Sequence, residues 1–138
     1  MTINEFAEQS ANIEFTYKIT PDVYYSFQRC SNDYNPLHTD ESFAGTKGFS
    51  GRVMYGNILN TFISHFVGML LPTRDVMILT QDINFRKPLF MNDEVHLESS
   101  IEDVSDAAGY VLYKLKFKRL GGAKNELVAS GHVRVGLI

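Results

Sequence analysis

Apolar and polar residues alternate along residues 13–19, which is the two-residue period of a strand with one buried face. The sequence Thr-Pro-Asp at residues 20–22 then has the features of a helix start. The threonine can cap the first turn, proline has a helical φ, and the acid lies near the positive end of the dipole. We therefore predict a strand over 13–19 and a helix that ends near Cys30. The predicted inner face of this helix carries Val23, Tyr24 and Phe27.

A longer apolar pattern covers residues 54–71. Its apolar residues recur in pairs at helical spacing, and the stripe is so wide that it predicts one long helix buried on most sides. Pro72 predicts the end of this helix. Between the two helices, the Asn-Pro step at residues 35–36 favours a loop over residues 31–40, and a short helix is predicted over residues 41–46.

After Pro72 the pattern changes to the period of strands. Four strands joined by short turns are predicted near residues 76–85, 94–104, 109–119 and 127–135. The order of elements fits an α+β fold in which an antiparallel sheet wraps around the long helix. Nothing repeats and no linker divides the chain, so residues 1–138 are expected to form one domain. The open edges of a small sheet predict a dimer.

Composition and charge exclude several functional classes. Thirteen basic and sixteen acidic residues give a net charge of -3, which argues against a nucleic-acid binder. A single cysteine, Cys30, excludes an internal disulfide and a multi-cysteine metal site. The N-terminus shows no signal peptide, and the apolar stretch over 53–71 contains polar side chains that would be costly in a membrane. A cytoplasmic protein without a membrane partner is expected.

The loop that ends at His38 contains the residue types best suited to catalysis. Asp33 and His38 lie five positions apart, with Asn35 and Pro36 between them. Histidine titrates near neutrality, and a neighbouring carboxylate can orient its ring and share a water with it. Asx-turns at Asp33 and Asn35 with a merely packed histidine explain the same residues, and short motifs match by chance. The residues alone leave both interpretations open.

The run Asp-Tyr-Asn-Pro-Leu-His at 33–38, followed by Ala44, resembles the hydratase-2 motif of the MaoC-like (R)-specific enoyl-CoA hydratases. The resemblance includes Phe27 upstream and extends along most of the chain. It covers Tyr55-Gly56, residues 84–88 and residues 130–135. It implies the hotdog fold, a homodimer with two active sites at its interface, and the reversible dehydration of (R)-3-hydroxyacyl thioesters. The implied substrate is a thioester of CoA or of an acyl carrier protein, and no metal or redox cofactor is implied.

The resemblance also implies roles for particular residues. Asp33 and His38 are expected to be the catalytic pair, and the backbone N–H of Gly56 is expected to polarise the thioester carbonyl. We expect Gly56 in the first turn of the long helix, where unpaired N–H groups and the helix dipole favour negative charge. The expected substrate contacts are Asn35, Tyr55, Ser64, Arg86 and Lys87. In a thioester enzyme the two basic residues would contact CoA phosphates or an acidic carrier protein, and a solvated strand end is the other interpretation of them.

Three residues depart from the family pattern. Asn32 and Asn92 stand where the family usually has glycine, and asparagine tolerates the left-handed conformation better than most residues. Tyr55 stands where the family usually has histidine, which affects the shape of the pocket. An ordinary serine bonded to a helix carbonyl is the alternative for Ser64. Two other functions stay open: a hotdog thioesterase, and a noncatalytic subunit that binds an acyl chain.

Overall fold

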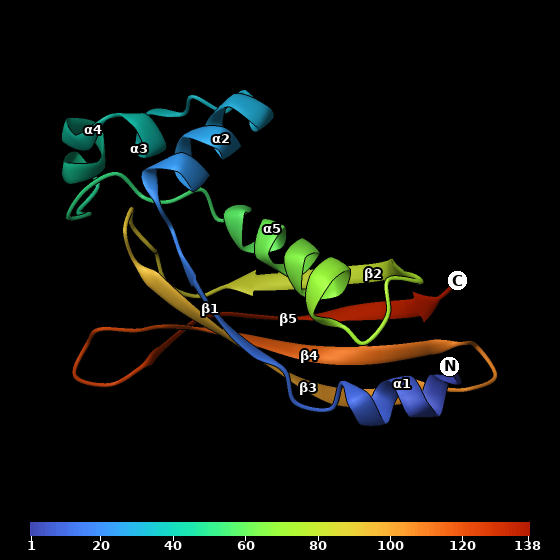
Figure 1. Cartoon of the computed structure of the whole chain (residues 1–138). Helices are drawn as coiled ribbons and strands as arrows, with labels where there is room; N and C mark the ends of the chain where they lie inside the picture. Colours follow the sequence, from blue (N-terminus) through green and yellow to red (C-terminus); the bar gives the residue numbers. More distant parts are fainter.

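A computed structural model of the chain describes residues 1–138 as a five-stranded antiparallel sheet with helices on its inner side and at one end (Figure 1). The strands are β1 (Glu14–Lys18), β2 (Val76–Phe85), β3 (Glu94–Ser105), β4 (Tyr110–Arg119) and β5 (Glu126–Leu137). Their order in the sheet is β1-β3-β4-β5-β2, so β1 and β2 form the two edges. The α+β prediction is confirmed, and the predicted strand positions agree closely with those observed.

The helices are α1 (Ile3–Gln9), α2 (Pro21–Ser31), α3 (Pro36–Thr39), α4 (Glu41–Thr46) and α5 (Ile58–His65), which continues into the π-helical segment η1 (Phe66–Leu70). Figure 1 shows α5 lying across the curved sheet, with α2, α3 and α4 gathered beyond one end of α5. Two short helices were not predicted. Thr2 and Glu5 form a capping box that starts α1. Asn35 caps α3, whose first residue is Pro36, so part of the predicted loop over 31–40 is helical.

The predicted helix over 54–71 begins later than expected. Met54 and Tyr55 are buried, but they belong to an extended segment in which the Met54 N–H donates to the Leu89 carbonyl at 2.8 Å. The helix proper begins at Ile58. Its core side chains pack against the sheet: Ile58, Leu59, Phe62, Ile63, Phe66 and Val67. The helix is less enclosed than predicted, because its opposite face is exposed in the single chain.

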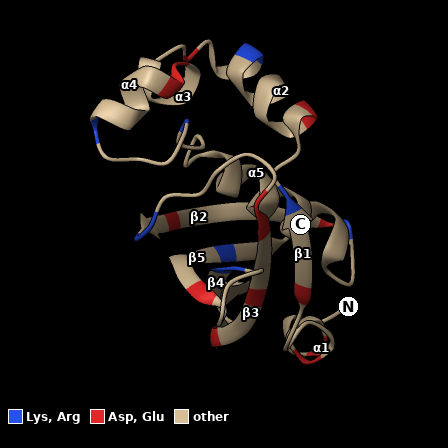
Figure 2. Ribbon diagram, turned by 90° about the vertical axis from the view of Figure 1, so that its left-hand side faces the viewer, with Lys and Arg blue, Asp and Glu red and all other residues tan.

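The edge strand β2 is exposed on both of its faces for most of its length. Its exposed apolar side chains include Met77, Ile78, Leu79 and Phe85. Figure 2 shows acidic and basic residues mixed over the visible strands and helices, with a basic segment directly after the tip of β2. This segment contains Arg86 and Lys87.

None of the helices combines the length and the apolar composition that a membrane crossing requires.

Candidate active site

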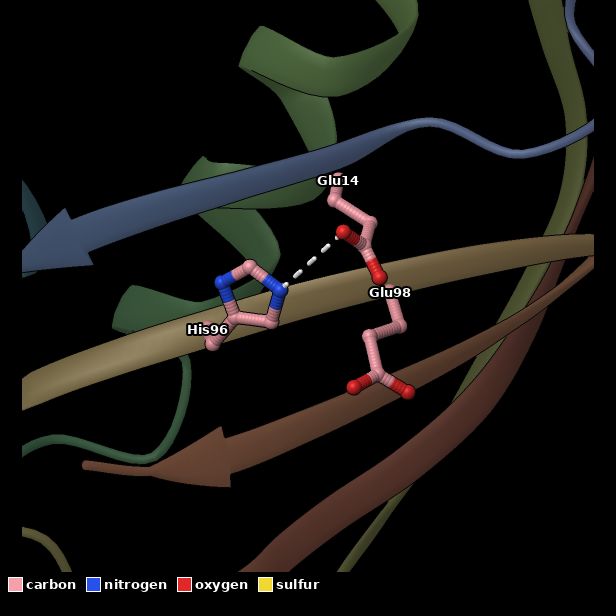
Figure 3. Close-up of side chains that lie close together, drawn as sticks. All are labelled: Glu14, His96 and Glu98. Atoms are coloured by element: carbon pink, nitrogen blue, oxygen red, sulfur yellow. Dashed lines mark ion pairs between the residues drawn. The ribbon is translucent and has the colours of Figure 1, made fainter. Parts of the chain in front are cut away.

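A cluster of titratable side chains lies on the outward face of β1 and β3 (Figure 3). One ligand atom from each of Glu14, His96 and Glu98 lies within 4.8 Å of the others. Glu98 accepts a hydrogen bond from Lys118 at 3.0 Å, and His96 Nε2 lies 3.7 Å from Glu14 Oε2. These charge pairs within the sheet account for the cluster. A cavity of about 230 Å³ beside it is lined by Glu14 and Glu98 but not by His96, and no hydrophobic residue lines it.

The second cluster begins where α2 ends. Asn32 has φ 55° and ψ 30°, the left-handed conformation, and its N–H donates to the Gln28 carbonyl at 2.9 Å. This ends the helix in the way a glycine usually does, and asparagine accepts the conformation at low cost. Asp33 is therefore the first residue of the loop that leaves the helix. Asn92 likewise has φ 71° in the turn before β3.

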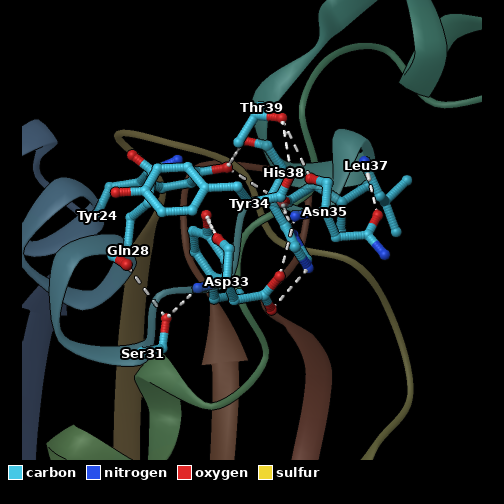
Figure 4. Close-up of polar contacts among 11 residues, drawn as sticks. Tyr24, Gln28, Ser31, Asp33, Tyr34, Asn35, Leu37, His38 and Thr39 are labelled. Carbon is cyan, nitrogen blue, oxygen red and sulfur yellow. Dashed lines mark hydrogen bonds and ion pairs between the residues drawn. The ribbon is translucent and has the colours of Figure 1, made fainter.

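The loop is held by two Asx-turns (Figure 4). Asp33 Oδ1 accepts the Asn35 N–H at 3.0 Å, and Asn35 Oδ1 accepts the Leu37 N–H at 2.9 Å. The turns suggested by the residue types are thus present, and they leave Asp33 Oδ2 directed toward His38. Asn35 acts as the cap of α3 and does not line the neighbouring cavities, so the structure shows a local role for it.

His38 and Asp33 face each other across a narrow gap. The distance from His38 Nε2 to Asp33 Oδ2 is 3.9 Å, too long for a direct hydrogen bond and suited to one bridging water or hydroxyl group. The other ring nitrogen, Nδ1, lies 2.7 Å from the Val53 carbonyl oxygen. A carbonyl can only accept, so Nδ1 carries a hydrogen, and Nε2 of the neutral ring is the proton acceptor. The His38 side chain is 16% exposed and that of Asp33 is 45% exposed.

The pair opens onto a cavity of about 280 Å³. Its lining residues are Phe27, Asp33, His38, Tyr55, Gly56, Asn57 and Phe85. An adjoining cavity of about 310 Å³ shares Gly56 and Phe85 with it and is also lined by Arg86 and Lys87. The structure therefore brings six of the eight predicted site residues into one region. Ser64 lines neither cavity and is exposed on α5, and Asn35 also lies outside them.

Gly56 lies before the helix, which corrects its predicted place in the first turn. Asn57 is the N-cap of α5, and the carbonyls of Tyr55 and Gly56 accept the first N–H groups of the helix at 3.0 Å each. The Gly56 N–H has no acceptor within the chain. A Cβ at Gly56 would lie 3.1–3.3 Å from the Phe85 ring, so glycine permits close packing at the junction of the two cavities.

Two buried tyrosines support the pair. The Tyr24 hydroxyl donates to the His38 carbonyl at 2.6 Å and lies 3.2 Å from the Val53 carbonyl, which also holds the imidazole. Burial raises the pKa of Tyr24 to about 12, so this hydroxyl is a donor at neutral pH. Tyr55 contacts both Asp33 and His38. The sequence placed Tyr24 on the inner face of α2 but carried no signal for its bonds or for the Val53 carbonyl.

Known proteins are similar to this chain over most of its length. Residues 4–118 match the family described as "MaoC like domain". The (R)-specific enoyl-CoA hydratase of Aeromonas caviae is 31% identical over 98 residues, which cover 71% of this chain and 73% of that protein. The protein of the same name from Rhodospirillum rubrum is 28% identical over 106 residues, covering 77% of this chain and 72% of that one.

The solved structures include the (R)-hydratase from A. caviae involved in PHA biosynthesis. It superposes with a TM-score of 0.82 at 26% identity, covering 92% of this chain and 94% of that one. This likeness confirms the predicted hotdog fold, a sheet wrapped around one central helix. With the family match over residues 4–118, these findings establish that the chain belongs to the MaoC-like domain family.

Proposed function

We propose that this protein catalyses the reversible hydration of trans-2-enoyl thioesters to (R)-3-hydroxyacyl thioesters. The observation that carries the proposal is the 3.9 Å gap between Asp33 Oδ2 and His38 Nε2. Both residues line a cavity that Gly56 also lines. Two acceptor atoms at this spacing can hold one water by both of its hydrogens. The names of the two relatives support the reaction class, and the (R) configuration is taken from them.

The proposed chemistry is a pair of proton transfers around that water. In the hydration direction, the water oxygen bonds to the β-carbon and one of its protons passes to the Asp33–His38 pair, while the α-carbon gains a proton from the pair. In the dehydration direction, the α-proton leaves and the β-hydroxyl departs as water. The Val53 carbonyl keeps the imidazole hydrogen on Nδ1, so Nε2 is the atom that exchanges protons. A C–O and a C–H bond form while one O–H bond and the C=C π bond break, with no net oxidation or reduction. The proposal therefore requires no redox cofactor, and it assigns the proton transfers to the two side chains rather than to a metal.

The Gly56 N–H is assigned to the thioester oxygen. Negative charge grows on this oxygen as the enolate forms, and a free N–H aimed at it stabilises the transition state more than the ground state. The absence of a side chain at Gly56 lets the Phe85 ring pack against the backbone there, so that both residues line the two cavities. The thioester group then lies at the junction of the two cavities.

The adjoining cavity is assigned to the carrier of the acyl group. Arg86 and Lys87 lie at its wall and can bind the phosphates of CoA or of a carrier-protein arm. Lys87 is already paired with Glu126 at 2.6 Å, whereas Arg86 makes only a 3.4 Å contact with the Ser130 hydroxyl. Arg86 is therefore the better-placed phosphate ligand of the two.

We further propose that the protein is a homodimer. The apolar side chains of β2 are exposed along an unpaired sheet edge, and pairing with a second β2 would cover them and extend the sheet. Light scattering at micromolar concentration should report twice the chain mass of 15.6 kDa. A monomer would contradict this. A cytoplasmic location stays a prediction of the sequence.

The purified chain tests the reaction directly. Trans-2-enoyl-CoA substrates of increasing chain length should lose the absorbance of the conjugated thioester when the protein is added, and the product should have the (R) configuration. Saturated acyl-CoA with a thiol reagent is the control, because only a thioesterase releases thiol from it. Thiol release without hydration would favour the thioesterase. Neither reaction with any chain length would favour a noncatalytic acyl-binding subunit.

A further inference from the structure

We propose that Tyr55 is a positioning residue that holds both members of the Asp33–His38 pair at their working separation, an inference that rests on the proposed hydratase function. Tyr55 lies in the extended segment between α4 and α5, and its side chain is 2% exposed. Two separate parts of that side chain contact the two members of the pair. The hydroxyl group contacts Asp33, and the ring contacts His38.

The hydroxyl holds the backbone of Asp33. It donates to the Asp33 carbonyl oxygen at 2.6 Å. Burial raises the pKa of Tyr55 above its ordinary value, so the group keeps its hydrogen at neutral pH. Asp33 lies outside any helix or strand, directly after the left-handed cap of α2. Its peptide N–H is bound only to the Ser31 hydroxyl, at 3.2 Å. The hydrogen bond from the Tyr55 hydroxyl to the Asp33 carbonyl therefore connects the backbone of this loop residue to the core.

The ring of Tyr55 supports the imidazole. The two ring centroids lie 4.1 Å apart with an interplanar angle of 28°, a stacked arrangement. Tyr24 and Phe27 pack on Tyr55 from other sides, each with a centroid distance of 5.2 Å, so the supporting ring is itself fixed. The Val53 carbonyl restrains the imidazole at Nδ1, and the stacked ring restrains its tilt.

These contacts set the distance on which the proposed chemistry depends. The gap between Asp33 Oδ2 and His38 Nε2 is defined only if the loop and the imidazole are both held. A displacement of about 1 Å can cost roughly 100-fold in rate, because the reacting atoms lose their alignment. Tyr55 itself does not need to touch the reacting atoms to have this effect.

Three variants separate positioning from packing. Tyr55→Phe keeps the ring and removes the bond to Asp33, while Tyr55→Leu removes both contacts. Tyr110→Phe is the matched control, because it removes a hydroxyl bond of 2.8 Å to Asp103 on strands that do not line the pocket. We expect Tyr55→Phe to lower kcat about 10-fold with little change in KM, and Tyr55→Leu to lower it further. The control should keep both constants, and the melting temperature of each variant reports its folding.

A double-mutant cycle tests whether Tyr55 acts through Asp33. In an Asp33→Asn background, the residual rate should not fall further when Tyr55→Phe is added, because the group being positioned is already inactive. Independent losses that multiply would overturn the inference, since Tyr55 would then act elsewhere. An unchanged kcat in Tyr55→Phe and Tyr55→Leu would overturn it as well.

The His38 ring signals in NMR give a readout that needs no activity. These signals can be assigned by comparison with His38→Ala. Stacking on Tyr55 should shift them upfield, and they should move back in Tyr55→Leu but not in Tyr110→Phe. If they do so in a chain without hydratase activity, the proposed function fails and the contacts stand. If the wild type is an active hydratase and these chemical shifts do not change in Tyr55→Leu, the positioning role of Tyr55 is wrong while the proposed function stands.

Discussion

His38 and His132 both lie beside carboxylates, yet only one of them is set up for proton transfer. His132, on β5, has Nδ1 3.2 Å from Asp82 Oδ1 and Nε2 3.1 Å from Glu102 Oε2, on the outward side of the sheet. Both of its nitrogens therefore face carboxylate oxygens within hydrogen-bond distance. His38 has Nδ1 bound to a neutral backbone carbonyl and Nε2 free across a 3.9 Å gap from Asp33.

The comparison shows what distinguishes a reactive pair from a surface ion pair. A nearby acid is common to both histidines, so it cannot be the criterion. His38 has a nitrogen open to a reactant, a cavity that admits one, and the free N–H of Gly56 at the same cavity. His132 lines none of the larger cavities of the fold, and its charge partners satisfy it.

Removing either member of the reactive pair should have the largest effect. Asp33→Asn and His38→Ala should each lower kcat by about 10²–10⁴-fold, the usual contribution of a positioned proton-transfer group. His132→Ala should leave kcat unchanged. The loss of enoyl-CoA absorbance measures the rate, and the melting temperature confirms that each variant is folded. A comparable loss of rate in His132→Ala would show that His132 also takes part in the reaction.

The N–H donor of the reactive site is tested at Gly56. Gly56→Val should lower kcat about 100-fold, because a side chain there meets the Phe85 ring and displaces the thioester from the N–H. Gly45→Ala is the control, since a Cβ at Gly45 meets nothing within 4 Å. If Gly56→Val instead lost stability while its folded fraction kept the native kcat, Gly56 would be a packing residue.

The same distinction between free and occupied groups applies to the two basic residues after β2. Arg86→Ala should raise the KM for enoyl-CoA about 10-fold, the value of one charged hydrogen bond, without lowering kcat. Lys87→Ala should have a smaller effect because Glu126 already pairs with Lys87. An enoyl-pantetheine substrate lacks the nucleotide phosphates, so its KM should be the same for wild type and Arg86→Ala. Equal effects of both variants on CoA substrates would contradict the assignment.

The smallest effect is expected from the outward ion pairs of His132. His132→Ala should lower the free energy of unfolding by about 0–1 kcal/mol, since exposed pairs are screened by water and salt. Urea titration measures this value, and added salt should reduce the difference from wild type. A loss of several kcal/mol would show that His132 organises the sheet.

Local patterns predicted most of the elements because each reports the burial of one face. β2 was predicted over 76–85 and α4 over 41–46, and both are observed there. The start of α5 could not be predicted in this way. Met54 and Tyr55 continue the apolar spacing of the helix, but they are buried from an extended segment bonded to Leu89, which is distant in the sequence. Periodicity records that a residue is buried and does not record which backbone buries it.

The candidate site divides along the same line. The residue types and spacing of Asp33, Asn35 and His38 indicated both the Asx-turns and the acid–histidine pair, because those features depend on neighbours in sequence. The bond from His38 to the Val53 carbonyl, the hold of Tyr55 on Asp33 and the contact of Phe85 with Gly56 each join separate segments. They form only when the sheet brings the turn before α5 against α2, α3 and the end of β2. The sequence alone determines which reactive groups lie near one another along the chain. The distances between those groups follow from packing between segments that are far apart in sequence.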